Sequence, residues 1–463
     1  MSAPAAAVWG APAARPGRRR KLGVAEWFLL GEILFQLALL VPVLNRGPLR
    51  VLWRVGVFAA SLALLALLRG KTRANPSNIA AFWVMALLAL EVFHPTSNTW
   101  LAAIAEFTMY VAILAPLFWM TRLHLDYPAF RRTLRLFWGY SSLSATVGLL
   151  QVYFPGRFQP QLSPIVASMG SSIAGLRITL ASGARIFRPM GLTDMPGGAA
   201  DAGMWAVLFG LGFLLTTPPG RTQTLRRALY LFTMVAGMAV IYLSQTRVLL
   251  VVLAVWFASL LALLFWRRRW REFGLLLLLV ALLGAGGLRW AAGVGGAQTL
   301  RRVESLFGGR HGNLYQRERG AFLAQTFHTL IPQYPLGAGL GRWGMMNTYF
   351  GDNHDPRRGL IYVEIQWQGW VLDGGLPLVF AYLALLALTL GSLARIARRR
   401  GPLAIWALLC LAYDVGALAL TFDYTPFTGE VGLQFWFVNA LVLAVASSPW
   451  PVALWKAPSP PPS

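Results

Sequence analysis

Long apolar segments separated by short polar turns make up most of the 463 residues. Hydrophobic residues account for 57% of the chain and charged residues for 13%. The apolar segments repeatedly approach the roughly 20 residues that a helix needs to cross a bilayer. They lack the alternation of a membrane β-barrel, and a helix keeps all backbone hydrogen bonds internal in lipid. The pattern therefore predicts an all-α, polytopic transmembrane helical bundle.

The apolar pattern predicts about twelve spans, judged by the length that crosses a bilayer. We expect them at residues 23–44, 51–68, 78–93, 99–120, 133–154, 198–217, 227–245, 248–266, 273–292, 361–393, 402–421 and 430–449. Alternate connections are short and basic, for example RGKTRANPS and ARIARRRG, as the positive-inside rule requires of cytoplasmic loops. Both termini are then cytoplasmic, and two long, partly helical loops, 155–197 and 293–360, lie outside.

The rest of the domain organisation follows from composition. Residues 1–22 are rich in Ala and Pro and end in a basic run, which predicts a disordered cytoplasmic tail, and residues 450–463 form a Pro-rich cytoplasmic tail. Residues 23–449 are expected to form one integral membrane domain in the lipid bilayer. The net charge of +24 is attributed largely to cytoplasmic loops, so no nucleic acid partner is expected. A lone Cys410 excludes an intramolecular disulfide.

The two long loops carry many arginines, whose guanidinium groups bind phosphate oxygens in pairs. This favours an anionic substrate, although the chain has 38 Arg against 3 Lys, so solvated loop charge is the competing interpretation. In GARIFRPMGLTDMPGG, Arg188 follows Arg185 and comes just before the sixth span. Arg247 stands in a short turn between spans seven and eight, where a charge is costly unless it is paired or snorkels to the interface.

The segment NLYQRERGAFLAQTFHTLI has helical periodicity, with one apolar stripe formed by Phe322, Leu323, Phe327 and Leu330. Arg319 falls within that stripe, whereas Arg317 points the opposite way. The periodicity therefore favours Arg319 as the buried anion ligand and Arg317 as the solvated residue.

Acidic residues near the spans are candidates for proton transfer. Glu364 and Gln368 are four residues apart and should share a helix face at the outer mouth of span ten. A partly desolvated carboxylate there could accept a proton from an attacking hydroxyl, and the alternative is an interfacial glutamate that merely faces water. Further acids lie inside the predicted spans, namely Glu32, Glu91, Glu106 and Asp414. They could pair with arginines, line a cavity or serve a proton pathway.

These pieces in order resemble the O-antigen ligase and polymerase superfamily of bacterial envelope glycan assembly. The resemblance covers residues 185–395 in motifs: RPMGLTDMPGGAA, SQTRVLLVVL, RGAFLAQTFHTLIPQYPLGAGLG and the turn from Asp373 to Leu376. Members of that family are membrane glycosyltransferases of the periplasmic face of the inner membrane, which transfer a glycan from an undecaprenyl diphosphate carrier to an acceptor hydroxyl. The resemblance implies that Arg188, Arg247 and, with a one-residue slip, Arg319 hold the diphosphate. No cofactor is expected, and no metal site is expected because the histidines lack a paired metal-binding spacing.

One departure affects the function. The family places a His-Asn pair about nine residues before the acid matched here by Asp373, where this chain has Glu364 and Ile365. We therefore expect Glu364 to act as the general base, with His354 in reserve. This fits a polymerase of lipid-linked repeat units into exopolysaccharide or O-antigen, together with other polysaccharide assembly and chain-length control proteins.

Three alternatives remain open at this stage. One is a ligase that transfers finished glycan to a lipid or protein acceptor. Another is a transporter or flippase, favoured by acids within the spans but opposed by the lack of repeat symmetry. The third, a metal-dependent glycosyltransferase, is disfavoured because the loops after spans one and three have no carboxylate pair.

Overall fold

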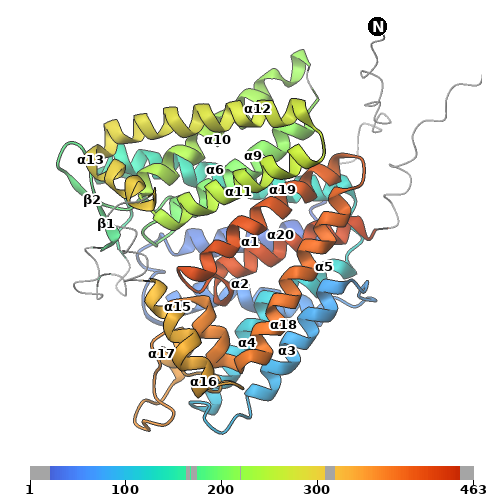
Figure 1. Cartoon of the computed structure of the whole chain (residues 1–463), viewed down its shortest axis with the longest axis vertical. Helices are drawn as coiled ribbons and strands as arrows, with labels where there is room; N and C mark the ends of the chain where they lie inside the picture. Colours follow the sequence, from blue (N-terminus) through green and yellow to red (C-terminus); the bar gives the residue numbers. More distant parts are fainter. Residues whose placement is uncertain (1–20, 163–166, 168–174, 219, 308–318, 449–463) are drawn as a thin grey trace, which may run out of the picture.

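The chain folds into a bundle of long helices with a small β-hairpin at one end (Figure 1). The computed structural model describes residues 21–162, 167, 175–218, 220–307 and 319–448. The helices are α1 (Val24–Ala38), α2 (Gly47–Leu67), α3 (Pro76–Glu91), α4 (Trp100–Leu114), α5 (Pro116–Arg122), α6 (Tyr127–Tyr153), α7 (Pro155–Phe158), α9 (Gly198–Thr216), α10 (Thr224–Ser244), α11 (Arg247–Trp266), α12 (Trp270–Ala281), α13 (Gly287–Phe307), α15 (Ala321–Gln325), α16 (Ile331–Gln333), α17 (Gly344–Phe350), α18 (Gln366–Ala397), α19 (Pro402–Ala417) and α20 (Glu430–Ala446). Short 3₁₀ or π turns are η2 (Arg221–Gln223), η3 (Leu282–Gly286), η5 (Thr326–Leu330), η6 (Leu418–Phe422) and η7 (Pro426–Thr428), and the strands are β1 (Arg177–Thr179) and β2 (Arg185–Phe187).

The predicted all-α class is confirmed, whereas the predicted count of about twelve spans is not. Seven helices of the described chain are long and apolar enough to cross a bilayer, or eight if the bent pair α4 and α5 forms one span. That pair bends by 42° at Pro116, which lacks the N–H that a continuous helix needs. Helices α3 and α20 are apolar but only 16 and 17 residues long. The protein is thus a multi-pass helical membrane protein.

Basic turns gather at one end of the bundle, which we call the basic end. Arg73 donates a hydrogen bond to the carbonyl of Ser447, and Arg122 donates to the carbonyls of Leu65 and Leu68 at 2.6 and 2.9 Å. The opposite end, the loop end, holds the described parts of segments 155–197 and 293–365. Here Asn98 donates to the carbonyls of Asp352 and Arg358. This two-ended arrangement agrees with the predicted separation of basic and long loops.

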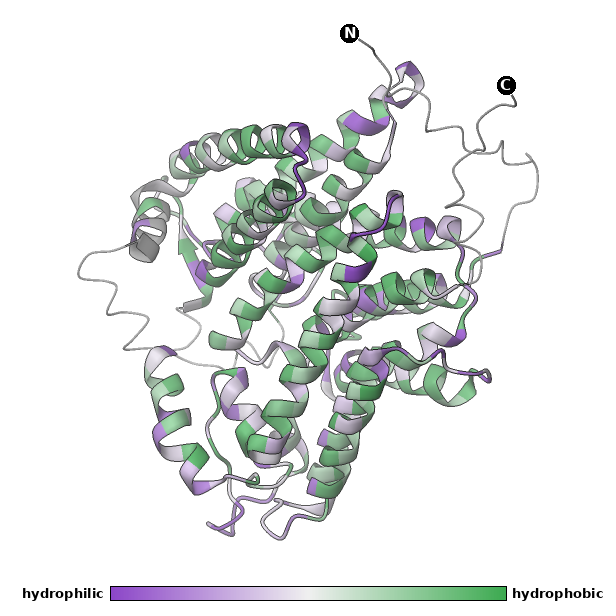
Figure 2. Ribbon diagram, turned by 45° about the vertical axis from the view of Figure 1, so that its right-hand side comes forward, coloured by the Kyte–Doolittle hydropathy of each residue, from purple (hydrophilic) through white to green (hydrophobic). Residues whose placement is uncertain are grey.

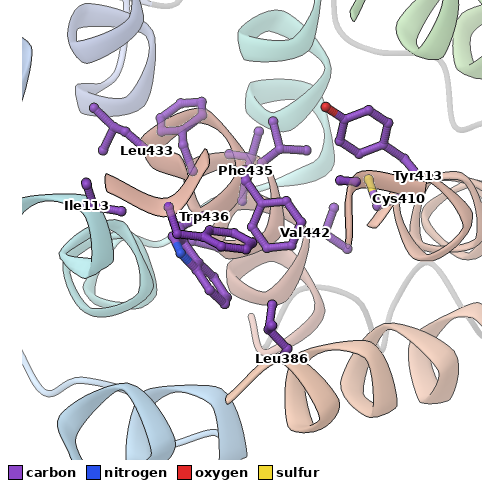
Figure 3. Close-up of a cluster of buried hydrophobic side chains, with 14 of the residues drawn as sticks. Ile113, Leu386, Cys410, Tyr413, Leu433, Phe435, Trp436 and Val442 are labelled. Atoms are coloured by element: carbon purple, nitrogen blue, oxygen red, sulfur yellow. The ribbon is translucent and has the colours of Figure 1, made fainter. Parts of the chain in front are cut away.

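Apolar side chains both fill the interior and cover the outside of the helices. Figure 2 shows hydrophobic residues along the helices and hydrophilic residues concentrated at their ends. Exposed leucines such as Leu275, Leu278 and Leu282 are the groups that lipid would contact. Figure 3 shows one buried cluster, to which α20 contributes Trp436 and α19 contributes Cys410.

A glycine turn joins the loop end to helices α3, α4 and α18. Gly337, Gly339 and Gly341 all have positive φ, at 108°, 80° and 77°. A methyl group on Gly339 would lie 2.5 Å from the backbone nitrogen of Ser97, so a side chain does not fit. The sequence GAGLGRWG therefore forms a tight turn, which packs residues 337–343 against the helix ends.

Helix α18 is interrupted where the glycine turn meets it. Gly374 and Gly375 leave helical geometry, Gly375 with φ of 60°, and Pro377 follows. The backbone N–H of Leu376 then bonds the carbonyl of Pro335 at 2.9 Å, and Ala338 donates to Leu372 at 2.6 Å. These bonds provide partners for backbone groups at the break, which lipid could not hydrogen-bond.

Candidate functional site

An ion pair between Arg319 and Glu364 stands at the start of α18. Arg319 Nη1 donates to Glu364 Oε2, and Arg319 Nε lies 3.7 Å from Asp423 Oδ1. The side chains of Arg319 and Glu364 are 31% and 24% exposed, so the pair is half-buried and reachable from solvent. The sequence predicts Arg319 as an anion ligand and Glu364 as a general base, and the structure places the two side chains in contact.

The prediction that Glu364 and Gln368 share a helix face is wrong, although the two residues are in contact. Helix α18 begins at Gln366, so Glu364 precedes it instead of sharing its face. Gln368 accepts the backbone N–H of Glu364 at 3.0 Å and donates to Oε1 of Gln325 at 3.1 Å. This buried amide therefore joins α18 to α15 and restrains the backbone next to the carboxylate.

The predicted apolar stripe near Arg319 is only partly correct. Leu330 is buried and Phe322 is half-buried, but Phe327 is exposed. The reason is the π turn η5, which spans Thr326–Leu330 and shifts the helical period after α15. Arg319 is half-buried, as expected of a ligand, whereas Arg317 lies outside the described residues.

Arg188 and Arg247 belong to two segments that lie next to each other, the loop that leads to α9 and the start of α11. The carbonyl of Pro189 accepts the backbone N–H of Gly197 at 3.2 Å. A methyl group on Gly197 would lie 3.9 Å from Oγ1 of Thr246, so this loop adjoins the residue that precedes α11. Both arginines are half-buried, and the buried Nε of Arg247 has no hydrogen-bond partner in the described part of the chain. A buried guanidinium nitrogen of this kind is suited to an anion.

Helix α11 links this arginine pair to the Arg319 region. Gly416 packs against the carbonyl of Val252, a turn and a half into α11, and η6 contacts the same helix. Asp423, the second partner of Arg319, directly follows η6. Figure 1 shows β2, the start of α11 and α15 along the same side of the molecule. Whether all three arginines converge on one cavity stays a prediction.

Two supporting candidates lie in open solvent. Arg185 is an exposed residue of β2, opposite Thr179 of β1. The His354 ring is fully exposed, with its Nε2 3.9 Å from Oδ1 of Asp352. A solvated imidazole in this position lacks the contacts that would orient it as a base, so the geometry gives Glu364 the stronger case.

Asp373 is buried between helices, away from the mouth of α18. It accepts hydrogen bonds of 2.6 Å from the Tyr110 hydroxyl and from Nε1 of Trp343, and it is 0% exposed. These contacts tie α4 and the residue before α17 to the break in α18. Asp373 therefore positions the helices around the site, instead of facing a substrate.

Two of the acids inside the helices, Glu106 and Asp414, accept hydrogen bonds from uncharged donors. Glu106 accepts the N–H of Gly341 at 2.5 Å, and Asp414 accepts from Asn439 at 3.2 Å. Glu91 has a buried Oε2 without a partner among the described residues. In the same part of the chain, no group of three or more His, Cys, Asp or Glu side chains could hold a metal ion.

A neutral histidine supports the glycine turn. Burial, followed by the nearby Arg342 guanidinium, lowers the pKa of His94 below its ordinary value of 6.5. Its Nδ1 can then accept the backbone N–H of Thr96 at 3.3 Å, while the Thr96 hydroxyl donates to the carbonyl of Ala338 at 2.7 Å. The turn that leads to α17 is thereby anchored to the end of α3.

Two features of the site were missed by sequence reasoning. Asp423 completes the surroundings of Arg319, and its signal was a charge directly after an apolar run, in TFDYTPF. Asp194 is buried against Arg50 and Arg54, from a helix about 140 residues earlier in the chain, and no spacing predicts that contact. Comparison with known families finds no matching family model, and no curated protein matches the chain.

Proposed function

We propose that the protein is a membrane glycosyltransferase that polymerises undecaprenyl-diphosphate-linked repeat units at the periplasmic face. The observation that carries the proposal is the Arg319–Glu364 pair at the head of α18, which combines an anion ligand and a carboxylate base. The partnerless Nε of Arg247 adds a second guanidinium suited to a phosphate oxygen. The family resemblance of these segments supplies the substrate class.

The reaction assigns a role to each group. The acceptor hydroxyl oxygen forms a bond to the anomeric carbon of the donor sugar. The bond between that carbon and the carrier phosphate breaks, and its electron pair leaves with the diphosphate. The hydroxyl proton passes to the carboxylate of Glu364. Guanidinium groups of Arg247, Arg188 and Arg319 stabilise the charge that develops on the leaving group.

The ion pair also suggests how substrate prepares the base. A diphosphate that binds Arg319 competes with Glu364 for the same donors. Because both side chains are partly exposed, the exchange has a small desolvation cost. Glu364 then loses its partner and is free to accept the proton, while its backbone stays restrained by Gln368.

Replacement of the base gives the most direct test. Glu364→Gln keeps the shape but cannot accept the proton, so we expect polymer formation to fall by about 10²- to 10⁴-fold. The measurement is polymer output, with mass spectrometry of the carrier-linked saccharides, in a host whose own gene is deleted. Single repeat units should accumulate.

The matched control is Asp355→Asn, which neutralises an exposed acid 3.9 Å from Arg358 in the same segment. Near-normal output from Glu364→Gln would remove the base role. Accumulation of full-length polymer on the carrier, in the deletion host, would contradict the polymerase and point to a ligase.

A further inference from the structure

Two glutamates from helices distant in sequence meet beside a small cavity at the loop end. Glu32 lies in the second half of α1, and Glu430 is the first residue of α20. The side-chain nitrogen of Gln434 donates to Oε1 of Glu32 at 2.6 Å and lies 3.4 Å from Oε1 of Glu430. Two carboxyl groups that share one donor in a buried site repel each other when both are charged, so a proton on one of them is favoured.

The cavity has its own unsatisfied polar atoms. It holds about 10 Å³, room for roughly one water molecule, and is lined by Glu32, Gln36, Trp53, Arg54 and Glu430, with Phe35, Leu39 and Val57. Gln36 is 8% exposed, and its Oε1 has no hydrogen-bond partner among the described residues. Nε1 of Trp53 is likewise buried without one. An acceptor and a donor at the same cavity point to a bound water next to the carboxyl pair.

The surrounding charges do not balance unless protons are held. Three carboxyls meet here, because Glu32 of α1 and Glu430 of α20 line the cavity together with Arg54, and Asp194 of the first long loop pairs with the same Arg54. They face two guanidiniums, those of Arg50 and Arg54 on α2, both of which pair with Asp194. Tyr140 of α6 donates a hydrogen bond to the carbonyl of Leu192, two residues before Asp194, at 3.1 Å.

The position of each glutamate indicates which one holds the proton. Glu430 stands at the N-terminus of α20, where the helix dipole favours a negative charge, and the charge of Arg54 acts on it. Glu32 lies inside a helix, is 5% exposed, and has no such compensation from its own helix. Glu32 is thus the glutamate expected to hold the proton, and Glu430 the one expected to be charged.

We propose that Glu32 and Glu430 form a proton-binding site that controls the anchor of the first long loop. Arg54 is shared between this site and Asp194, whose segment continues from Arg188. When the pair holds its proton, one negative charge remains and Arg54 stays on Asp194. When the proton is lost, a second negative charge draws Arg54 away and loosens the segment. The proposal does not depend on the glycan reaction.

Infrared difference spectroscopy in lipid nanodiscs tests the proton. Glu32→Gln should remove the carbonyl band of a protonated carboxyl from the wild-type spectrum. Glu26→Gln is the matched control, because Glu26 is a buried residue of the same helix that pairs with Arg132 at 3.1 Å. That control should remove carboxylate bands instead. Loss of carboxylate bands alone in Glu32→Gln would overturn the proposal.

Hydrogen exchange tests the control of the loop. After correction for intrinsic exchange, protection of residues 186–197 should decrease with rising pH in the wild type by several-fold and stay constant in Glu32→Gln, which cannot lose the proton. Equal pH dependence in the two proteins would overturn the link to the loop. If Glu32→Gln does not fold, the same infrared and hydrogen-exchange measurements on Glu430→Gln test the proposal. That variant removes the other carboxyl group of the site.

Discussion

The two arginine–carboxylate clusters of the loop end differ in their access to solvent. In the Asp194 cluster the carboxylate is 1% exposed and receives Arg50 at 2.6 Å and Arg54 from a second turn of α2. In the Arg319 cluster the partners Glu364 and Asp423 are 24% and 36% exposed. A charge buried like Asp194 cannot lose its partners without a large cost, whereas a half-exposed arginine can exchange a carboxylate for a ligand. The first cluster fixes the loop, and the second is suited to binding.

Removal of the buried acid should have the largest effect. Asp194→Ala leaves two guanidiniums at the loop end without their carboxylate, and we expect the free energy of unfolding to fall by about 3–5 kcal/mol. Thermal unfolding of the purified protein in nanodiscs measures it. Asp355→Ala, in an exposed turn, is the control and should unfold like wild type. If Asp194→Ala changes the free energy of unfolding as little as this control does, Asp194 is not buried against its arginines in lipid.

The arginine at the start of α11 should affect activity more than stability. Nε of Arg247 has no hydrogen-bond partner among the described residues, so Arg247→Gln removes no hydrogen bond of that atom. If it holds the diphosphate, polymer formation falls by about 10²- to 10³-fold, the cost of one lost charge-stabilising donor. Arg247→Lys should restore part of it. Output that stays at the wild-type level in Arg247→Gln would remove this residue from the diphosphate site.

The half-exposed pair should contribute least to stability. Arg319→Gln removes the ion pair with Glu364, and we expect the free energy of unfolding to change by no more than about 1 kcal/mol, since solvent screens such pairs. The same thermal unfolding assay measures the change. A loss as large as that of Asp194→Ala would mean that the Arg319 cluster is structural, and the contrast between the clusters would fail.

The helical class could be predicted because lipid leaves the backbone few choices, but the number of spans could not. Hydropathy does not show where a helix ends: α1 stops at Ala38 and α18 starts at Gln366, several residues inside the predicted spans. The predicted apolar stripe near Arg319 is only partly correct for the related reason that the π turn η5 changes the helical period without changing composition.

The sequence by itself determined the apolar helices, the separation of basic turns from long loops, and the residue types of the candidate site. Those properties depend on local composition and on the contrast between lipid and water. Only the tertiary structure decided that Arg319 meets Glu364, that Asp373 is buried between Tyr110 and Trp343, and that Glu32 and Glu430 line the same cavity. Each contact joins residues distant in sequence, so helix packing, and not spacing along the chain, sets their distance.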